Sequence, residues 1–491
     1  MISTRRALLL AELQERRRAA AGATSIPRRA DTGPAPLSFS QQRMWFLDQW
    51  EPGAPTQNAA RAIRIHGELD VDALAQAFTS VVERHTSLRT VFVLHNREPR
   101  QVVLEQWSLD LPVVDLSSSP EELAGRLRDL SREPFDLSAD LMIRTTLFRL
   151  GAQEAVLLLR LHHIAADAFS DSVLMGEVAA IYRSLREGVP PELPELPIQY
   201  ADFACWQLER IRGKLLDELV AYWTNELRGA PELLPLPTDR PRRRVQRHEG
   251  GRHEVQLSAE VAADVRSLAR QEGCTAYMVL LAVFSTLLYR LTGVDDVVVG
   301  SPIANRTATE LTPMIGFFCN TVALRTRLDG NPSFRQVCRR VRATALGAYQ
   351  HQELPFERVV ELLNIPRDPA YNPIFQVNFR AIDGARQPLA LVGTETSLVP
   401  VDIGFSRFDL ALELHVDADG VAGYFEFDRD LFDAPTVARF AADLDALAEQ
   451  VLADPDLPIL AARLPYGPRS PATAQTIPRR RAESHAQQEG K

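Results

Sequence analysis

The strongest constraint on the fold of this chain is an alternation of strands and helices that stops at one connector and then starts again. Before the connector, Val71–Arg84 has apolar residues at helical spacing and Ala155–Leu161 is typical of a strand. The connector, PELLPLPTDRPRRR at 231–244, is rich in proline and arginine. After it come an apolar helix at Ala276–Leu291 and a strand at Val297–Val299. Because 491 residues exceed one compact domain, we predict two α/β (α+β) lobes.

The loss of apolar periodicity at both ends sets the predicted domain boundaries. Residues 1–36 combine a predicted helix, rich in arginine in its last turns, with a linker rich in proline, glycine and arginine. This segment is either a solvated cap on the fold or a docking element for another protein. We place one lobe at 37–228 and the other at 229–465. Residues 466–491 lack the periodicity and are predicted to be disordered.

Composition argues against several classes of protein. No apolar run approaches the roughly 18 residues of a membrane span, and the apolar patch Ala7–Leu10 is followed by Glu12 and arginines, unlike a secretory signal. A net charge of −9 argues against general nucleic-acid binding. The four cysteines are scattered without a C-x-x-C pair, so neither a disulfide framework nor a zinc cage is indicated. We expect a soluble, cytoplasmic, monomeric protein that binds neither nucleic acid nor membranes.

The stretch with the clearest chemical character is HHIAADAFS at 162–170, directly after a predicted strand. Strand alternation places His162 and His163 on opposite faces, so they cannot easily share a metal, and HHxxxD alone is a weak ligand set. A neutral imidazole could remove a proton from an amine or a hydroxyl. Equally, both histidines could be satisfied polar groups at a strand end, with Asp167 fixing the turn. The residues alone leave the catalytic and the structural interpretation open.

Two common catalytic signatures are absent from the sequence. There is no G-x-S-x-G nucleophile elbow and no G-x-x-x-x-G-K-[ST] phosphate loop. If the chain is an enzyme, we therefore expect it to join two substrates that arrive already activated.

Eight motifs in order resemble those of condensation domains of nonribosomal peptide synthetases, in the chloramphenicol-acetyltransferase-like superfamily. The resemblance extends from about Leu37 to Leu464. The motifs are LSFSQQRMWFLDQ (37–49), RHTSLRTVF (84–92), HHIAADAFS (162–170), YADFACWQ (200–207), GSPIANR (300–306) with IGFFCNTVALR (315–325), HQELPFERVV (351–360), NPIFQVNF (372–379) and SRFDLAL (406–412). The resemblance implies two acetyltransferase-like lobes arranged as a V-shaped pseudo-dimer with a central tunnel.

The same resemblance implies a condensation enzyme. A carrier protein would present the acyl or aminoacyl donor as a thioester on its phosphopantetheine arm, and an amine from a second carrier or from solution would attack it. No cofactor would be intrinsic to the chain. His163 would act as base or as orienter of the amine, and His162 would be structural. Much of the rate could come from positioning the reactants.

The resemblance also assigns other positions. Asp167 would pair with a core arginine, for which Arg84 and Arg89 are the candidates, because a buried unpaired carboxylate is costly. Asn320 could lie on the tunnel floor and bind a substrate amide. Ser406 could line the acceptor side.

One residue departs from the family pattern, since Ala168 stands where the family has glycine. Its methyl group could narrow the tunnel beside His163, or strain the turn if φ is positive.

Three functions stay open for this chain, which carries a condensation unit alone and is expected to be free-standing. They are amide formation, ester formation or atypical acyl transfer to a soluble acceptor, and inactive recruitment of carriers or tailoring enzymes. Family members that recruit oxygenases alter the second histidine, which is intact here.

Overall fold

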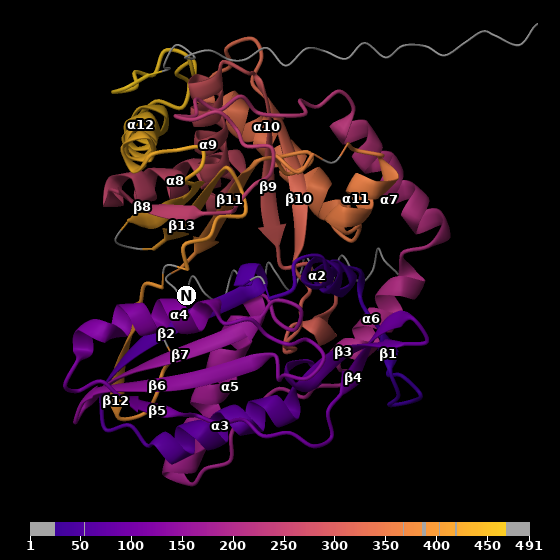
Figure 1. Ribbon diagram of the computed structural model, residues 1–491. Helices are drawn as coiled ribbons and strands as arrows, with labels where there is room; N and C mark the ends of the chain where they lie inside the picture. Colours follow the sequence, from indigo (N-terminus) through magenta and orange to yellow (C-terminus); the bar gives the residue numbers. More distant parts are fainter. Residues whose placement is uncertain are drawn as a thin grey trace, which may run out of the picture.

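The computed structural model describes residues 25–467, apart from 54, 367, 385–388, 402 and 418–419. Two lobes lie one above the other (Figure 1), each built on one large sheet. The predicted helix near the N-terminus and the predicted disordered segment from 468 onward lie outside the described residues.

The first lobe is organised around β7 (Glu154–His162), whose sequence EAVLLLRLH is apolar almost throughout. On one side, Leu157 and Leu159 pack against helices α3 and α5; on the other, Val156 and Leu158 pack against α4. A strand buried on both faces needs such a continuous apolar run. The sheet order is β12-β2-β7-β6-β5, in which β12 is Thr394–Val399. The remaining bounds are β2 (Asn58–Gly67), β5 (Val113–Asp115), β6 (Ile143–Gly151), α3 (Val71–Arg84), α4 (Leu123–Arg132) and α5 (Ala168–Glu187).

The second lobe has a six-stranded sheet in the order β10-β9-β11-β13-β14-β8, with four helices against one face. Phe284, Phe379 and Phe425 meet in this core, while Arg380 and Glu413 pair across neighbouring strands on the opposite face. The bounds are β8 (Gly250–Leu257), β9 (Asp296–Ile303), β10 (Asn320–Arg327), β11 (Val377–Asp383), β13 (Leu410–Val416), β14 (Val421–Asp428), α8 (Ala259–Glu272), α9 (Ala276–Thr292), α10 (Phe334–Gln350) and α12 (Ala434–Ala453).

Several shorter elements connect the lobes. Helices α6 (Tyr200–Arg210) and α7 (Gly213–Leu227) lead along one side of the molecule from the first lobe to the second (Figure 1). Across the junction, Arg43 Nη1 of α2 (Phe39–Trp50) lies 2.6 Å from Glu357 Oε1 of α11 (Phe356–Leu362). A small third sheet, β1-β4-β3, belongs to the first lobe; its strands are β1 (Ala35–Pro36), β3 (Thr90–His95) and β4 (Glu98–Val103).

The strand β12 belongs to the sheet of the first lobe, although its residues are predicted from the sequence to lie in the second lobe. The strand β12 (Thr394–Val399) pairs antiparallel with β2, from Thr394 opposite Gly67 to Val399 opposite Ala62. The grouping of 229–465 in one lobe therefore does not hold for β12. The physical reason is that β2 would otherwise present an edge of unpaired N–H and C=O groups.

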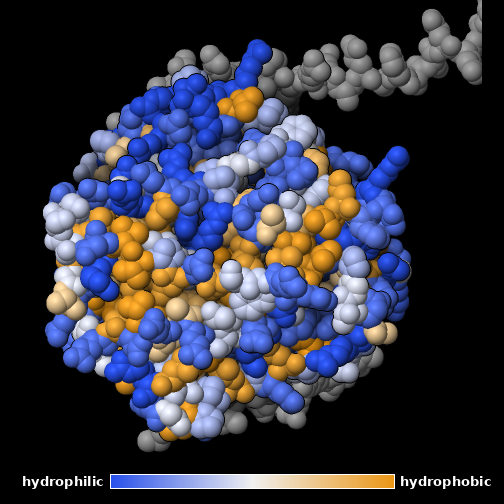
Figure 2. Space-filling view, turned by 60° about the horizontal axis from the view of Figure 1, so that its bottom comes forward, coloured by the Kyte–Doolittle hydropathy of each residue, from blue (hydrophilic) through white to orange (hydrophobic). Residues whose placement is uncertain are grey.

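The outer surface mixes hydrophobic and hydrophilic side chains. On the face shown in Figure 2, hydrophobic residues lie in several patches separated by hydrophilic ones. Within the described part of the chain, no single helix is long and apolar enough to cross a membrane; α8 and α9 reach that length together, with a bend of 107° between them.

Candidate functional site

His162 ends β7 and points into the first lobe. Its side chain is 4% exposed, and its ring packs edge-on against Phe135 with centroids 5.8 Å apart. Nδ1 accepts a hydrogen bond from the backbone N–H of Ile164 at 3.2 Å. Burial, together with the positive charge of Arg407, lowers the pKa of His162 to about 3. His162 is therefore a neutral side chain that stabilises the turn by a hydrogen bond, in agreement with its predicted structural role.

His163 faces the other way and keeps one ring nitrogen free. Its backbone N–H donates to Gln57 O at 2.9 Å. Its Nδ1 lies 3.2 Å from Ala166 O, and because a carbonyl oxygen only accepts, Nδ1 carries the hydrogen. Among the described residues, none forms a hydrogen bond with Nε2, which therefore holds a lone pair. The ring of Phe317 lies alongside, with centroids 6.1 Å apart.

The electrostatics of His163 decide what its lone pair can do. Loss of solvation, with the positive charge of Arg407, lowers the pKa of His163 to about 3. Such an imidazole stays neutral at physiological pH and is a weak base. It suits accepting a hydrogen bond from an amine, and so orienting it, better than full proton removal. Across the described chain, no group of three or more His, Cys, Asp or Glu side chains is placed to hold a metal ion.

The two depressed histidine pKa values predict a stability that falls in mild acid. In the unfolded chain each imidazole takes up a proton near pH 6.5, whereas the folded form does so only near pH 3. Stability contributed by the neutral rings is therefore present above pH 6.5 and is lost as the pH falls toward 3. We expect the free energy of unfolding to drop by about 2 kcal/mol per histidine between pH 7 and 5.

Urea denaturation at pH 7, 6 and 5 measures this loss. The His162→Asn variant is the matched comparison, because an amide oxygen can replace Nδ1 as the acceptor and does not titrate. It should lose less stability on acidification than the wild type, and an identical pH slope would contradict the assignment.

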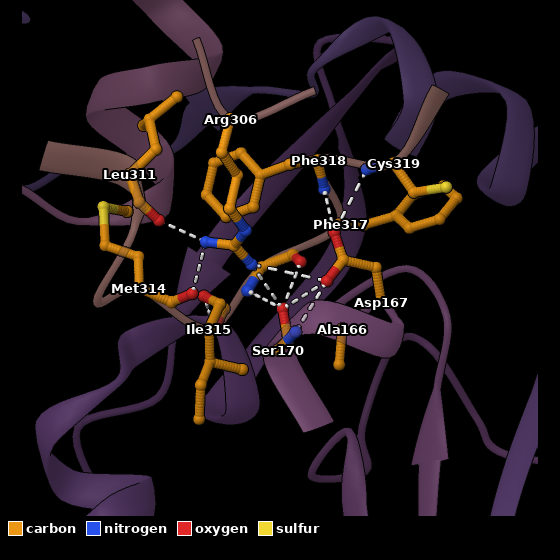
Figure 3. Close-up of polar contacts among 12 residues, drawn as sticks. Ala166, Asp167, Ser170, Arg306, Leu311, Met314, Ile315, Phe317, Phe318 and Cys319 are labelled. Carbon is orange, nitrogen blue, oxygen red and sulfur yellow. Dashed lines mark hydrogen bonds and ion pairs between the residues drawn. The ribbon is translucent and has the colours of Figure 1, made fainter. Parts of the chain in front are cut away.

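Asp167 braces the turn after the histidines (Figure 3). It caps α5: its Oδ1 accepts from the backbone N–H and from the hydroxyl of Ser170, both at 2.8 Å. Its Oδ2 accepts the backbone N–H groups of Phe318 and Cys319 at 3.0 and 3.1 Å. Nη2 of Arg306 completes the set at 3.3 Å, forming a buried ion pair. The carboxylate thus joins the HHxxxD turn to a loop of the second half of the chain.

The predicted partners of Asp167 were wrong. Arg84 Nε instead donates to Glu177 Oε1 at 3.1 Å, and Arg89 Nη1 donates to Leu104 O at 2.7 Å. The observed partner, Arg306, ends the GSPIANR motif, and its sequence position lies 139 residues from Asp167. The arginine at the end of the GSPIANR motif was the only hint of this partner in the sequence. Spacing along the chain cannot show which distant arginine pairs with a buried carboxylate.

Asn320 lies at the start of β10 and is a structural residue, contrary to prediction. Its Nδ2 donates to Gln352 O and Leu354 O, both at 2.8 Å. Its Oδ1 accepts from the N–H groups of Thr321 and Phe356 at 2.8 and 3.0 Å. An amide side chain has two donor hydrogens and two acceptor positions, so none is left for a substrate. Asn320 is also 6% exposed.

Ser406, which was predicted to line the acceptor side, is buried and hydrogen-bonded within its own loop. The residue is 1% exposed, and its hydroxyl donates to Phe408 O at 2.7 Å. Its backbone N–H donates to His248 O at 3.0 Å. Ser406 therefore anchors its loop, because burial and hydrogen bonding leave its hydroxyl unavailable.

Ala168 is the first residue of α5 and is exposed. It adopts a helical conformation and is absent from the described residues with positive φ, so the expected backbone strain does not arise. Asp167, with φ −118° and ψ 179°, makes the turn before it. No glycine is needed here, since any L-residue fits the first position of a helix.

We expect Ala168→Gly to keep the fold and to preserve or raise turnover. Glycine in a helix costs about 0.5–1 kcal/mol relative to alanine, and the exposed methyl group makes no contact that the turn requires. Thermal unfolding and turnover of this variant, beside Ala180→Gly in the middle of the same helix, measure the effect. A large fall in turnover for Ala168→Gly alone would show that the methyl group contacts the substrate.

The two lobes, each built on one large sheet, with HHxxxD at the end of a first-lobe strand, define a protein of the chloramphenicol-acetyltransferase-like class. The family model of the condensation domain matches residues 32–465, and the chain belongs to this family. The resemblance drawn from the motifs is therefore confirmed, while the V-shaped arrangement around a tunnel stays a prediction.

The relatives that this chain matches are synthetases or synthase subunits much longer than the chain. A component of the linear gramicidin synthase of Brevibacillus parabrevis is 41% identical over 441 residues, covering 87% of this chain and 6% of the relative. Phosphinothricin tripeptide synthetase PhsC of Streptomyces viridochromogenes is 40% identical over 438 residues, covering 88% of this chain and 40% of the relative. The chain thus spans less than half the length of both.

Solved structures show the same fold. The X-domain from teicoplanin biosynthesis superposes with a TM-score of 0.80 at 30% identity, covering 90% of this chain and 100% of that one. The same X-domain has been solved in complex with OxyB, with a TM-score of 0.79.

Proposed function

We propose that this chain forms an amide bond between a carrier-bound acyl or aminoacyl thioester and an acceptor amine. The observation that carries the proposal is the free Nε2 lone pair of His163 in a neutral ring held by Ala166 O. In the reaction, the amine nitrogen attacks the thioester carbonyl carbon and the C–N bond forms. The C–S bond then breaks, and the phosphopantetheine thiol leaves with the proton that the amine loses. Nε2 accepts the hydrogen bond that orients the amine.

The relatives support this proposal by their names, because one is part of a gramicidin synthase and the other is a tripeptide synthetase. A carrier protein is the donor partner and supplies the phosphopantetheine arm. The acceptor arrives on a second carrier or as a soluble amine or alcohol; with an alcohol, the same lone pair would orient a hydroxyl and the product would be an ester.

One observation favours a second candidate function. The X-domain that shares 30% of its sequence with this chain has been solved in complex with OxyB. A non-catalytic module that recruits a tailoring enzyme is therefore the alternative to catalysis. The intact His163 and Asp167 favour the catalytic proposal.

Incubation with an aminoacyl-loaded carrier and a panel of amines and alcohols, followed by mass spectrometry, tests these functions. We expect amide products from amines with the wild type and none with His163→Ala. The His66→Ala variant, altered at an exposed position on β2, should match the wild type. Ester products alone would shift the assignment to acyl transfer onto hydroxyls. No product from any acceptor, with measurable carrier binding, would contradict catalysis and favour recruitment.

A further inference from the structure

Arg407 connects the second lobe to the segment that holds His163. It lies in the loop between β12 and β13, where the chain returns from the first lobe to the second. Its Nη2 donates a hydrogen bond to Thr56 O at 2.7 Å. The next carbonyl along the chain, that of Gln57, accepts the N–H of His163 at 2.9 Å. Two consecutive carbonyl groups of one short segment therefore bind Arg407 and His163.

The backbone that carries Arg407 is fixed on both sides. Asn372 Nδ2 donates to Arg407 O at 2.7 Å. The preceding residue, Ser406, is buried and hydrogen-bonded. Two positions further on, the fully buried Asp409 accepts from Arg242 Nη1 at 2.8 Å. A side chain that starts from such a loop is already placed for its contact, so little conformational freedom is lost in making it.

Within the described chain Arg407 forms no ion pair, although the negative charge of Glu426, which pairs with Arg252, acts on it from beyond ion-pair distance. Other arginines of this region are paired: Arg380 Nη1 lies 3.2 Å from Glu413 Oε2, and Arg252 Nη2 lies 3.5 Å from Glu426 Oε2. Among the residues that the structure describes, no ion pair within 4.0 Å includes Arg407. Arg407 is exposed to solvent, and its surroundings, mainly through partial loss of solvation, lower its pKa. A guanidinium still keeps its proton at physiological pH, so the positive charge of Arg407 persists there.

This charge acts on the histidines of the site. Besides burial, Arg407 lowers the pKa of both His162 and His163, and Arg380 and His162 add smaller effects on His163. The positive charge of Arg407 thus opposes protonation of the ring whose lone pair the reaction needs.

We propose that Arg407 is a positioning residue for amide formation: from the second lobe it fixes the segment that holds His163 and places a positive charge beside the reacting groups. The inference rests on the proposed function. When the amine attacks the thioester carbonyl, an electron pair moves onto the carbonyl oxygen, and a fixed cation nearby favours that negative charge. The same cation keeps Nε2 of His163 free to accept the amine hydrogen.

The test compares Arg407→Met, which removes the charge and the hydrogen bond, with Arg407→Lys, which keeps the charge. Arg339→Met, an exposed arginine paired with Glu272, is the control. We expect Arg407→Met to lower kcat about 10- to 100-fold, the size of effect that misplacement of a reacting group produces. The imidazole of His163, followed by NMR with labelled histidine, should begin to titrate at higher pH. Arg407→Lys should titrate like the wild type and recover part of kcat.

The outcomes separate this inference from the proposed function. A wild type that makes no amide overturns the proposed function, while the NMR titration still reports on Arg407 without substrate. A wild type that makes amide, with Arg407→Met unchanged in kcat and in the titration of His163, overturns the inference. If Arg407→Met does not fold, Arg407→Gln replaces it, and an unchanged titration there overturns the inference equally.

Discussion

Replacing His163 with alanine should lower the rate of amide formation about 100-fold, the size of effect expected when a reacting amine loses the group that orients it. The reason is that the lone pair on Nε2 of His163 accepts the hydrogen bond that orients the amine. Among the described residues of this turn, no other imidazole nitrogen has a free lone pair. Single-turnover kinetics with an aminoacyl-loaded carrier and a saturating amine measure this rate. The fold should be retained, because Nδ1 contributes one hydrogen bond, to Ala166 O.

His162→Ala is the matched comparison, since the two histidines are neighbours with different surroundings. His162 is buried against Phe135 and holds the N–H of Ile164, so its loss should lower the melting temperature more than that of His163 does. If His163→Ala retained the full rate, His163 would have no part in the mechanism.

Replacing Asp167 with alanine should lower the free energy of unfolding by about 3–5 kcal/mol, the cost of leaving a buried charge unpaired. The change strands the guanidinium of Arg306, which is 4% exposed in its side chain. It also removes the acceptor of four further hydrogen bonds, from the N–H and hydroxyl of Ser170 and from the N–H groups of Phe318 and Cys319. Urea denaturation of the purified variant gives the value.

A double-mutant cycle identifies the partner. Asp167→Ala combined with Arg306→Met should show a coupling energy of about 1–3 kcal/mol, because the two residues are in contact. The cycle with Arg84→Met should be additive within about 0.5 kcal/mol, because Arg84 pairs with Glu177 instead. Coupling to Arg84 without coupling to Arg306 would contradict the structure.

The local structure of this chain was predictable because its causes are local. The helix α3 has the bounds Val71–Arg84 that its apolar spacing predicted, with Asp70 accepting from the N–H of Ala73 as its cap. The strand before HHIAADAFS was predicted from its apolar run, and burial on both faces explains that run. The separate orientations of His162 and His163 followed from strand alternation.

The missed features depend on contacts between distant parts of the chain. The choice of Arg306 for Asp167 depends on how the loop after β9 folds against α5, which no spacing reports. Asn320 is a polar residue that follows an apolar run. That pattern is equally typical of a residue that binds a substrate and of one that holds a backbone segment by hydrogen bonds. In the structure the backbone of the segment 352–356 lies against Asn320 and forms hydrogen bonds with its side chain, so the residue has a structural role.

The pairing of β12 with β2 bears on how the chain is synthesised and divided. During translation β2 emerges more than 300 residues before its partner strand, since residue 67 pairs with residue 394. The first lobe therefore stays open along that edge until the ribosome has passed residue 399. It follows that a gene cut at the proline-rich connector would not encode the fifth strand of the first-lobe sheet.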